Sequence, residues 1–265
     1  MSTFNQHEFR FGFSREGLTY SVQAIIMVNV LVFVLQLLLD VPFGNAVFFD
    51  APGGELFLEV FGYSTTRVLQ GWIWTPATYM FVHAGLQHLF FNMLLLFFFG
   101  PDVERLLGTR QFLRFYFLCG IVGVLVNMLT LALGGPAVAV IGASGAIMGV
   151  VVAFAVVDPD RQIFLFPLPF PITARAMVII FIVLDLLSVA SGGRGTSVAT
   201  HLGGMAVGFL YMRYRPLLLQ WTLRHRRRPK SPRNSRDPEG PSKEKQESLA
   251  KAVDNIFKFQ GKDRK

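Results

Sequence analysis

The sequence contains little cysteine and few charged residues, and each of these shortages excludes some classes of protein. Its one cysteine, Cys119, lies inside an apolar run, which excludes a disulfide framework and a cysteine-based metal site. The N-terminal stretch MSTFNQHEFRFGFSREG lacks a basic region, an apolar core and a cleavage site, so we expect no removable signal peptide. Only 16% of the residues are charged while 52% are hydrophobic, which indicates a membrane protein with several spans.

Lysine is missing from most of the chain, and the positive charge is confined to the C-terminal end. No lysine precedes Lys230. The residues after Thr222 include fourteen Lys or Arg and six Asp or Glu, whereas those before it include eleven of each kind. This composition predicts a basic, disordered cytoplasmic tail over residues 217–265 that helps to fix the topology and contacts membrane lipids. The alternative is a nucleic-acid-binding arm, but no interleaved aromatic pattern or fold supports it, and we expect no nucleic-acid partner.

Apolar segments near the length that a bilayer requires recur along the chain. They are Tyr20–Leu39, Leu86–Phe99, Phe112–Leu133, Gly145–Val157, Ile172–Val189 and Val198–Met212. Arginines concentrate before the first segment, between the second and third, between the fourth and fifth, and after the sixth. By the positive-inside rule both termini are cytoplasmic, and the long first loop, Asp40 to Gly85, is external. Its aromatic residues, among them Trp72 and Trp74, suit the membrane interface.

Polar residues within three of these segments fall at a similar depth. Ser144 opens the fourth segment, His201 opens the sixth, and His88 and Asn92 are four residues apart on one helix face. At about 1.5 Å per residue of helix, all of these residues lie about 15–21 Å from the cytoplasmic ends of their segments. In a hydrocarbon core of about 30 Å, this level is about 10 Å below the outer surface. Polar residues that only form hydrogen bonds between helices would not be expected to lie at the same depth in the membrane. The common depth therefore indicates that these residues form a single functional site.

The chemistry of these residues favours a serine nucleophile. The hydroxyl of Ser144 needs a base to accept its proton, and the neutral imidazole of His201 is a suitable one. Glycines follow both residues at helical spacing, which lets their helices approach closely. The helix N-terminus at Ser144 offers free N–H groups to an oxyanion, and His88 and Asn92 add side-chain donors. Asp185 is interpreted as facing a cavity or paired; no acidic residue has an obvious place to orient His201, so a Ser–His dyad is predicted.

Several motifs, in order, resemble those of the rhomboid family of intramembrane serine proteases. They are HAGLQHLFFNMLLLFFFGPDVERLLG, GASGAIMG and HLGGMAVGFL, within a resemblance that covers about Trp74 to Tyr214. The resemblance implies an all-α, six-transmembrane-helix bundle that cleaves transmembrane protein substrates and uses no metal or cofactor. It implies Ser144 as the nucleophile, His201 as the base, and an oxyanion hole made by the Ser144 backbone with His88 and Asn92. His83 matches the first, structural histidine of the family's motif.

The resulting organisation has three parts. Residues 1–19 are expected to form a cytoplasmic segment, residues 20–216 the six-helix protease domain, and residues 217–265 the basic tail. The chain is predicted to be a multi-pass integral protein of a prokaryotic plasma membrane. One alternative is a catalytically inactive rhomboid-like protein that binds membrane clients, although such relatives typically lose the serine or the histidine. Another is a small-solute transporter, which would show inverted repeats that we do not find.

Hydrolysis also needs water at Ser144, which lipid cannot supply. The non-helical segment Gly134–Ala143 is tolerated at that depth only if it is buried in protein or lines a wet cavity. We therefore expect a polar cavity that opens to the external side. Substrate is expected to enter sideways from the lipid, with the fifth segment and the glycine-rich loop Ser191–Thr196 as the gate.

Overall fold

The structure is a computed structural model, and it describes most of the chain between Gly17 and Arg226. The described residues are 17–43, 47–48, 51–52, 56–134, 139–164, 170–191, 198–226, 244, 247–248 and 250–251. The chain divides into two compact units, residues 1–218 and residues 219–265. The first unit contains the candidate site. The predicted gate loop, beyond Ser191, and most of the predicted tail lie outside the described residues.

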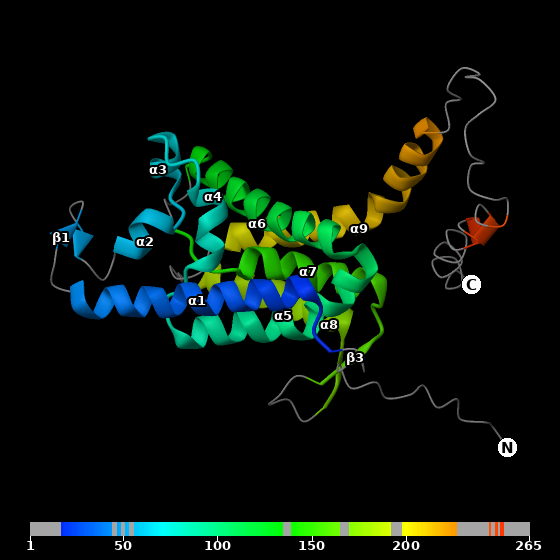
Figure 1. Cartoon of the computed structure of the whole chain (residues 1–265), viewed down its shortest axis with the longest axis horizontal. Coiled ribbons are helices and arrows are strands. Elements are labelled where there is room, and N and C mark those ends of the chain that lie inside the picture. The colour runs from blue at the N-terminus through cyan, green and yellow to red at the C-terminus, as the bar shows by residue number, and fades with distance from the viewer. Residues whose placement is uncertain are drawn as a thin grey trace, which may run out of the picture. The chain divides into compact units, whose positions relative to one another are not determined.

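A helix lies over each of the predicted apolar segments. These helices are α1 (Tyr20–Phe43), α5 (Leu86–Leu107), α6 (Thr109–Ala132), α7 (Ser144–Val157), α8 (Ala174–Ala190) and α9 (Val198–Arg226) (Figure 1). Among the described residues, three stretches are long and apolar enough to cross a membrane, namely Tyr20–Leu39, Leu86–Leu107 and Thr109–Ala132. The shorter α7 is also apolar. The prediction of a largely helical membrane protein is therefore confirmed.

The helix ends differ from the predicted ends where polar groups find partners inside the protein. Helix α5 continues past Phe99 although Glu104 follows. The Glu104 carboxylate is buried and accepts hydrogen bonds from the backbone N–H groups of Ser21 and Val22, at the start of α1. A charge that is satisfied in this way does not have to end an apolar helix. Helix α8 begins only at Ala174, after a strand that ends at Thr173, and the Thr173 hydroxyl accepts a hydrogen bond from the Ala176 N–H.

Short strands and helices make up the described connections. Strand β3 (Gln162–Ile163) pairs antiparallel with β4 (Ile172–Thr173), and β1 (Val47–Phe48) pairs antiparallel with β2 (Ala51–Pro52). The first loop also contains α2 (Leu56–Phe61), α3 (Thr65–Leu69), α4 (Thr75–Thr78) and the 3-10 helix η2 (Tyr79–Phe81). In this loop the rings of Trp72 and Trp74 stack, and the Arg67 guanidinium lies over the Trp72 ring. Their place in the membrane interface stays a prediction.

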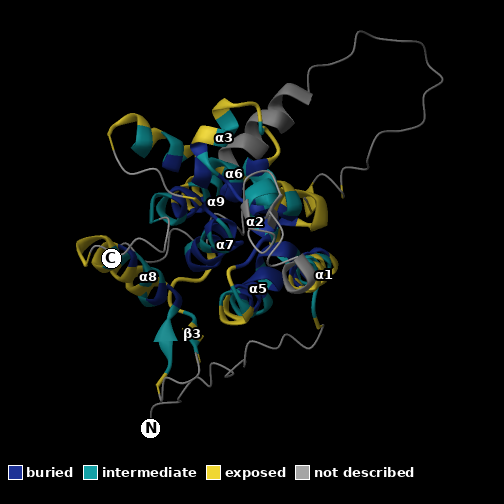
Figure 2. Ribbon diagram, turned by 90° about the vertical axis from the view of Figure 1, so that its left-hand side faces the viewer, coloured by how far each residue is buried: buried dark blue, intermediate teal, exposed yellow. Residues whose placement is uncertain are grey.

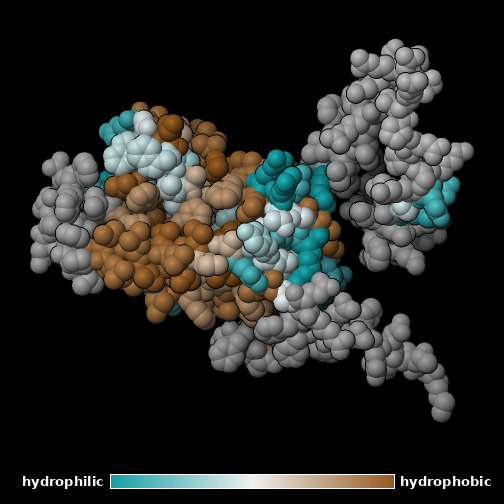
Figure 3. All heavy atoms as spheres, in the orientation of Figure 1, coloured by the Kyte–Doolittle hydropathy of each residue, from teal (hydrophilic) through white to brown (hydrophobic). Residues whose placement is uncertain are grey.

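Helix α7 lies at the centre of the first unit. In the end-on view it is surrounded by α5, α6, α8 and α9, and α1 lies beside α5 (Figure 2). Its residues from Gly145 to Ala155 are buried, apart from Met148, because small and β-branched side chains let the neighbouring helices pack closely. The outer surface is apolar instead: Figure 3 shows a hydrophobic band over α1, where Met27, Leu31 and Leu38 are exposed. An apolar surface of this extent suits contact with lipid rather than water.

Candidate active site

The site forms where α7 and α9 touch through glycine. A side chain at Gly204 of α9 would collide with the carbonyl oxygen of Gly145 on α7, and one at Gly208 would collide with that of Gly149. Only hydrogen atoms fit between the two backbones, which is how small residues allow close helix contacts in membranes. The prediction that these two helices approach through their glycines is confirmed.

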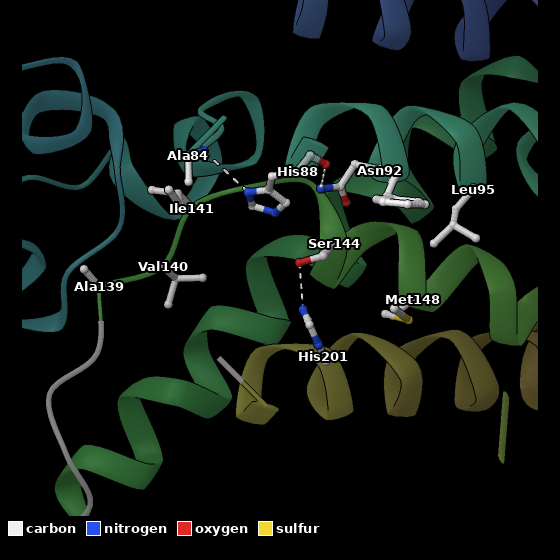
Figure 4. A pocket seen from close by; sticks show the side chains of 11 residues that line it. Ala84, His88, Asn92, Leu95, Ala139, Val140, Ile141, Ser144, Met148 and His201 are labelled. Carbon is white, nitrogen blue, oxygen red and sulfur yellow. Dashed lines mark hydrogen bonds between the residues drawn. The ribbon is translucent and has the colours of Figure 1, made fainter. Parts of the chain in front are cut away.

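This contact brings Ser144 and His201 together. Ser144 is the first residue of α7, and His201 lies in the first turn of α9, although 57 residues separate them in sequence. The Ser144 Oγ lies 2.7 Å from the Nε2 of His201 (Figure 4). At that distance the hydroxyl can donate a hydrogen bond to the imidazole, which is the arrangement that proton transfer from a serine requires.

The second nitrogen of His201 faces a carboxylate. Its Nδ1 lies 3.0 Å from Oδ1 and 3.2 Å from Oδ2 of Asp185 on α8. The two side chains are each 12% exposed, so the pair is largely shielded from solvent. The expectation that Asp185 is paired is confirmed, and the structure places its carboxylate beside His201, where the sequence indicated no acidic residue. A depth count gives Asp185 a height similar to that of the other site residues, since it is ten residues beyond Arg175, about 15 Å along a helix, but it does not give the direction of the side chain.

The predicted oxyanion donors come from the opposite side of the same space. His88, Asn92, Ser144 and His201 line one cavity of about 280 Å³, together with apolar residues such as Leu95 and Met148 (Figure 4). The Ala84 N–H lies 3.4 Å from the Nδ1 of His88 and donates to it, which leaves the hydrogen of that imidazole on Nε2. The Asn92 amide donates one hydrogen to the His88 carbonyl oxygen and has a second to offer.

Gly142 makes room for the His88 ring. Its φ of +97° lies in the left-handed region, and a Cβ there would lie 2.5 Å from Cε1 and 2.6 Å from Nε2 of His88. The segment that leads to Ser144 is held by the first loop. The Gly142 N–H donates to the Tyr79 carbonyl, and Tyr63 and Val140 exchange two backbone hydrogen bonds. Neither tyrosine could be predicted from the sequence, because these contacts are backbone hydrogen bonds, which do not depend on side-chain chemistry.

His83 contacts the site through the ring of His88. Its side chain is fully buried, and its ring packs edge-on against the His88 ring at a centroid distance of 5.0 Å. Burial, and to a smaller extent the neighbouring His88, lower the pKa of His83 to about 4, so its ring is neutral at pH 7. The Gln36 amide donates to the His83 carbonyl oxygen and ties this position to α1. These contacts fit the structural role expected for the first histidine of the motif.

Metal ligands do not gather here. Within the part of the chain that the structure describes, no three His, Cys, Asp or Glu side chains are grouped so that they could hold a metal ion. The groups available to a reacting molecule are therefore a hydroxyl, two imidazoles, a carboxamide and the backbone N–H groups at the start of α7. Together they can supply a nucleophile, a base and hydrogen-bond donors to a developing negative charge.

Comparison with known proteins agrees with the motifs. The family described as the Rhomboid domain matches residues 70–216, which include all the side chains that line the cavity. The chain belongs to the rhomboid family. Rhomboid protein 1, mitochondrial, of Saccharomyces cerevisiae is 33% identical over 136 residues, which cover 49% of this chain and 38% of the yeast protein.

Other relatives in the rhomboid family match a similar part of the chain. The Presenilin-associated rhomboid-like protein, mitochondrial, of Bos taurus is 31% identical over 135 residues, 51% of this chain and 36% of that protein. The protein of Bacillus subtilis (strain 168) named "Putative rhomboid protease YdcA" is 39% identical over 106 residues, 39% of this chain and 51% of that protein. Each match thus spans about half or less of the relative. Since two of these three relatives are named mitochondrial, the comparisons do not support the predicted prokaryotic plasma membrane.

Proposed function

We propose that this rhomboid is an intramembrane serine endopeptidase. The observation that carries the proposal is the distance of 2.7 Å between the Ser144 Oγ and the His201 Nε2, at the wall of a cavity that His88 and Asn92 also line. A hydroxyl held against an imidazole, with donors across the cavity, is the arrangement that acyl transfer needs. No cofactor takes part in this chemistry.

The proposed reaction proceeds in two halves. The Ser144 Oγ attacks the scissile carbonyl carbon as its proton moves to the Nε2 of His201, and the carbonyl oxygen becomes an oxyanion. The Ser144 N–H, the Nε2–H of His88 and the free amide hydrogen of Asn92 stabilise this charge. His201 then gives its proton to the leaving amine, which leaves an acyl-enzyme. A water molecule, deprotonated by His201, hydrolyses the ester and restores the serine.

The proposed setting is a six-helix membrane domain over residues 20–216, in which α1 and α5 to α9 all cross the bilayer. Residues 1–19 and the basic tail, 217–265, then lie on the cytoplasmic side, in agreement with the distribution of arginine and lysine. The cavity opens toward the external side. Transmembrane protein substrates enter sideways from the lipid past α8, whose outer face exposes large apolar side chains such as Ile179, Leu184 and Leu187.

The alternative is a catalytically inactive rhomboid that binds membrane clients. A protein of that kind has no use for a serine hydroxyl aligned with an imidazole, and it has no need to keep both residues. The alignment of Ser144 with His201, and of His201 with Asp185, therefore favours the protease. The alternative predicts normal client binding by a Ser144→Ala variant together with no detectable reaction at the serine of the wild type.

Covalent labelling separates the two functions. The purified protein in detergent is incubated with a fluorophosphonate probe, which phosphonylates a serine that an adjacent base activates, and the modified residue is located by mass spectrometry. If the protein is a serine protease, the probe should label Ser144, and the labelling should be lost in Ser144→Ala and His201→Ala. Ser64→Ala is the matched control, since Ser64 precedes α3 and its side chain makes no capping hydrogen bond. A wild-type protein that stays unlabelled at Ser144 contradicts the proposal.

A further inference from the structure

We propose that Asp185 is a positioning residue that holds His201 in the tautomer and orientation needed for catalysis; this inference rests on the proposed function. The observation is that each of the two ring nitrogens of His201 faces a different polar side chain. Nε2 faces the Ser144 hydroxyl at 2.7 Å, and Nδ1 faces the Asp185 carboxylate at 3.0 and 3.2 Å. Three consecutive helices of the bundle, α7, α8 and α9, each contribute one member.

The chemistry of the carboxylate fixes the tautomer. An ionised aspartate can only accept hydrogen bonds, so the hydrogen of the neutral His201 ring resides on Nδ1. The lone pair of Nε2 is then free to accept the proton of Ser144. When that proton is transferred, His201 becomes an imidazolium and Asp185 stays ionised beside it, so the positive charge has a partner at hydrogen-bond distance.

The surroundings of Asp185 strengthen this effect. Its neighbours Leu184, Leu186 and Leu187 on α8 are apolar and exposed on the outside of the helix, whereas the aspartate itself is buried. Charges that are shielded from water interact more strongly than charges at an aqueous surface. Among the residues that the structure describes, the polar side chains that face the His201 ring are Asp185 from α8, Ser144 from α7 and His88, across the cavity, from α5. Asp185 is the one carboxylate among them.

The nature of the substitution at position 185 distinguishes positioning from a scaffold contact. The Asp185→Asn amide can donate a hydrogen to Nδ1, which favours the tautomer with its hydrogen on Nε2, where it opposes Ser144. Asp185→Ala removes the partner without imposing that tautomer. Asp185→Glu keeps an acceptor. If Asp185 positions His201, turnover should be highest in the wild type, lower in Asp185→Glu and lower again in Asp185→Ala, and Asp185→Asn should equal Asp185→Ala or fall below it. If Asp185 is only a scaffold contact, Asp185→Asn, which is closest to it in shape, should turn over faster than Asp185→Ala.

The experiment measures each variant in detergent per folded molecule, with thermal unfolding used to correct for misfolded protein. The readouts are the rate of fluorophosphonate labelling at Ser144 and the kcat and KM for a transmembrane reporter substrate. We expect Asp185→Asn to lower kcat by about 100-fold or more while KM changes little. The matched control is Asp102→Asn, which removes ion pairs with Arg105 and Arg161. Asp102 lies near the C-terminal end of α5, so this variant should keep a wild-type rate.

Three results would overturn the inference, and the third is distinguishable from the first two. If wild type and the Asp185 variants all label Ser144 at one rate per folded molecule, or if Asn is above Ala in proportion to stability, Asp185 is a scaffold contact and the proposed protease stands. If wild type itself does not label at Ser144, the proposed function fails and this inference fails with it.

Discussion

At the scale of single residues, Gly142 combines a left-handed backbone conformation with close contact to His88, a proposed oxyanion donor. Gly142→Ala places a methyl group in the volume of the His88 ring and also strains a left-handed backbone. Displacement of one oxyanion donor costs about 10²–10³-fold in turnover, so we expect kcat to fall by about that factor. Enzyme assays of the purified variant, corrected for folded protein, measure this loss.

The matched control for this prediction is Gly134→Ala. Gly134 has a φ of +86°, so the backbone strain is similar, but no atom lies within 4 Å of its Cβ position. The control should keep near-normal turnover per folded molecule. Equal losses in the two variants would mean that backbone strain alone is responsible and that the His88 ring does not need the space.

Most site residues could be predicted from the sequence because each carries its own signal. Ser144, His201, His88 and Asn92 are polar residues in apolar segments, and their depths agree. Asp185 carried the same signal but was not matched to His201, because a sequence states the height of a residue on its helix and not the direction in which it points. Only the packing of α8 beside α9 supplies that direction.

At the scale of helices, the glycine contact between α7 and α9 sets the distance on which the site depends. Gly204→Val adds a branched side chain where a Cβ alone would collide with the Gly145 carbonyl oxygen. The helices must separate, which we expect to lower the free energy of unfolding by about 1–3 kcal/mol and to reduce Ser144 labelling in the molecules that stay folded. Thermal unfolding and probe labelling of the same sample measure the two effects.

Ala206→Val on the same helix is the control for this prediction. Ala206 is exposed on the outer side of α9, so added methyl groups there meet no backbone. Stability and labelling should both stay near wild type. If Gly204→Val behaved like Ala206→Val, the close contact between α7 and α9 would not determine the geometry of the site.

The helices themselves were predictable, whereas their connections were not. Runs of apolar residues located α1 and α5 to α9, because burial and lipid both select for hydropathy. The continuation of α5 to Leu107 was missed, since it depends on the hydrogen bonds that the Glu104 carboxylate accepts from the backbone N–H groups at the start of α1. The β3–β4 pair and the hydrogen bonds between Tyr63 and Val140 depend on contacts between distant segments, which hydropathy does not record.

At the scale of the whole molecule, the proposed reaction requires the cavity to open toward the external side. A Ser144→Cys variant in a Cys119→Ala background should react with a membrane-impermeant thiol reagent added from outside sealed, oriented vesicles. Cys119 is fully buried, so the chain that keeps Cys119 and Ser144 should not react and serves as the control. Reaction only from the cytoplasmic face would mean that the proposed topology is inverted.

The central claim is that Ser144 and His201 act together as nucleophile and base, and cleavage of a transmembrane reporter in reconstituted vesicles tests it most directly. We predict that wild type and Ser64→Ala cleave the reporter, that Ser144→Ala and His201→Ala each fall to background, and that the double variant is no worse than either single one, because the two residues act as a unit. Substantial cleavage by a correctly inserted Ser144→Ala variant would contradict the account.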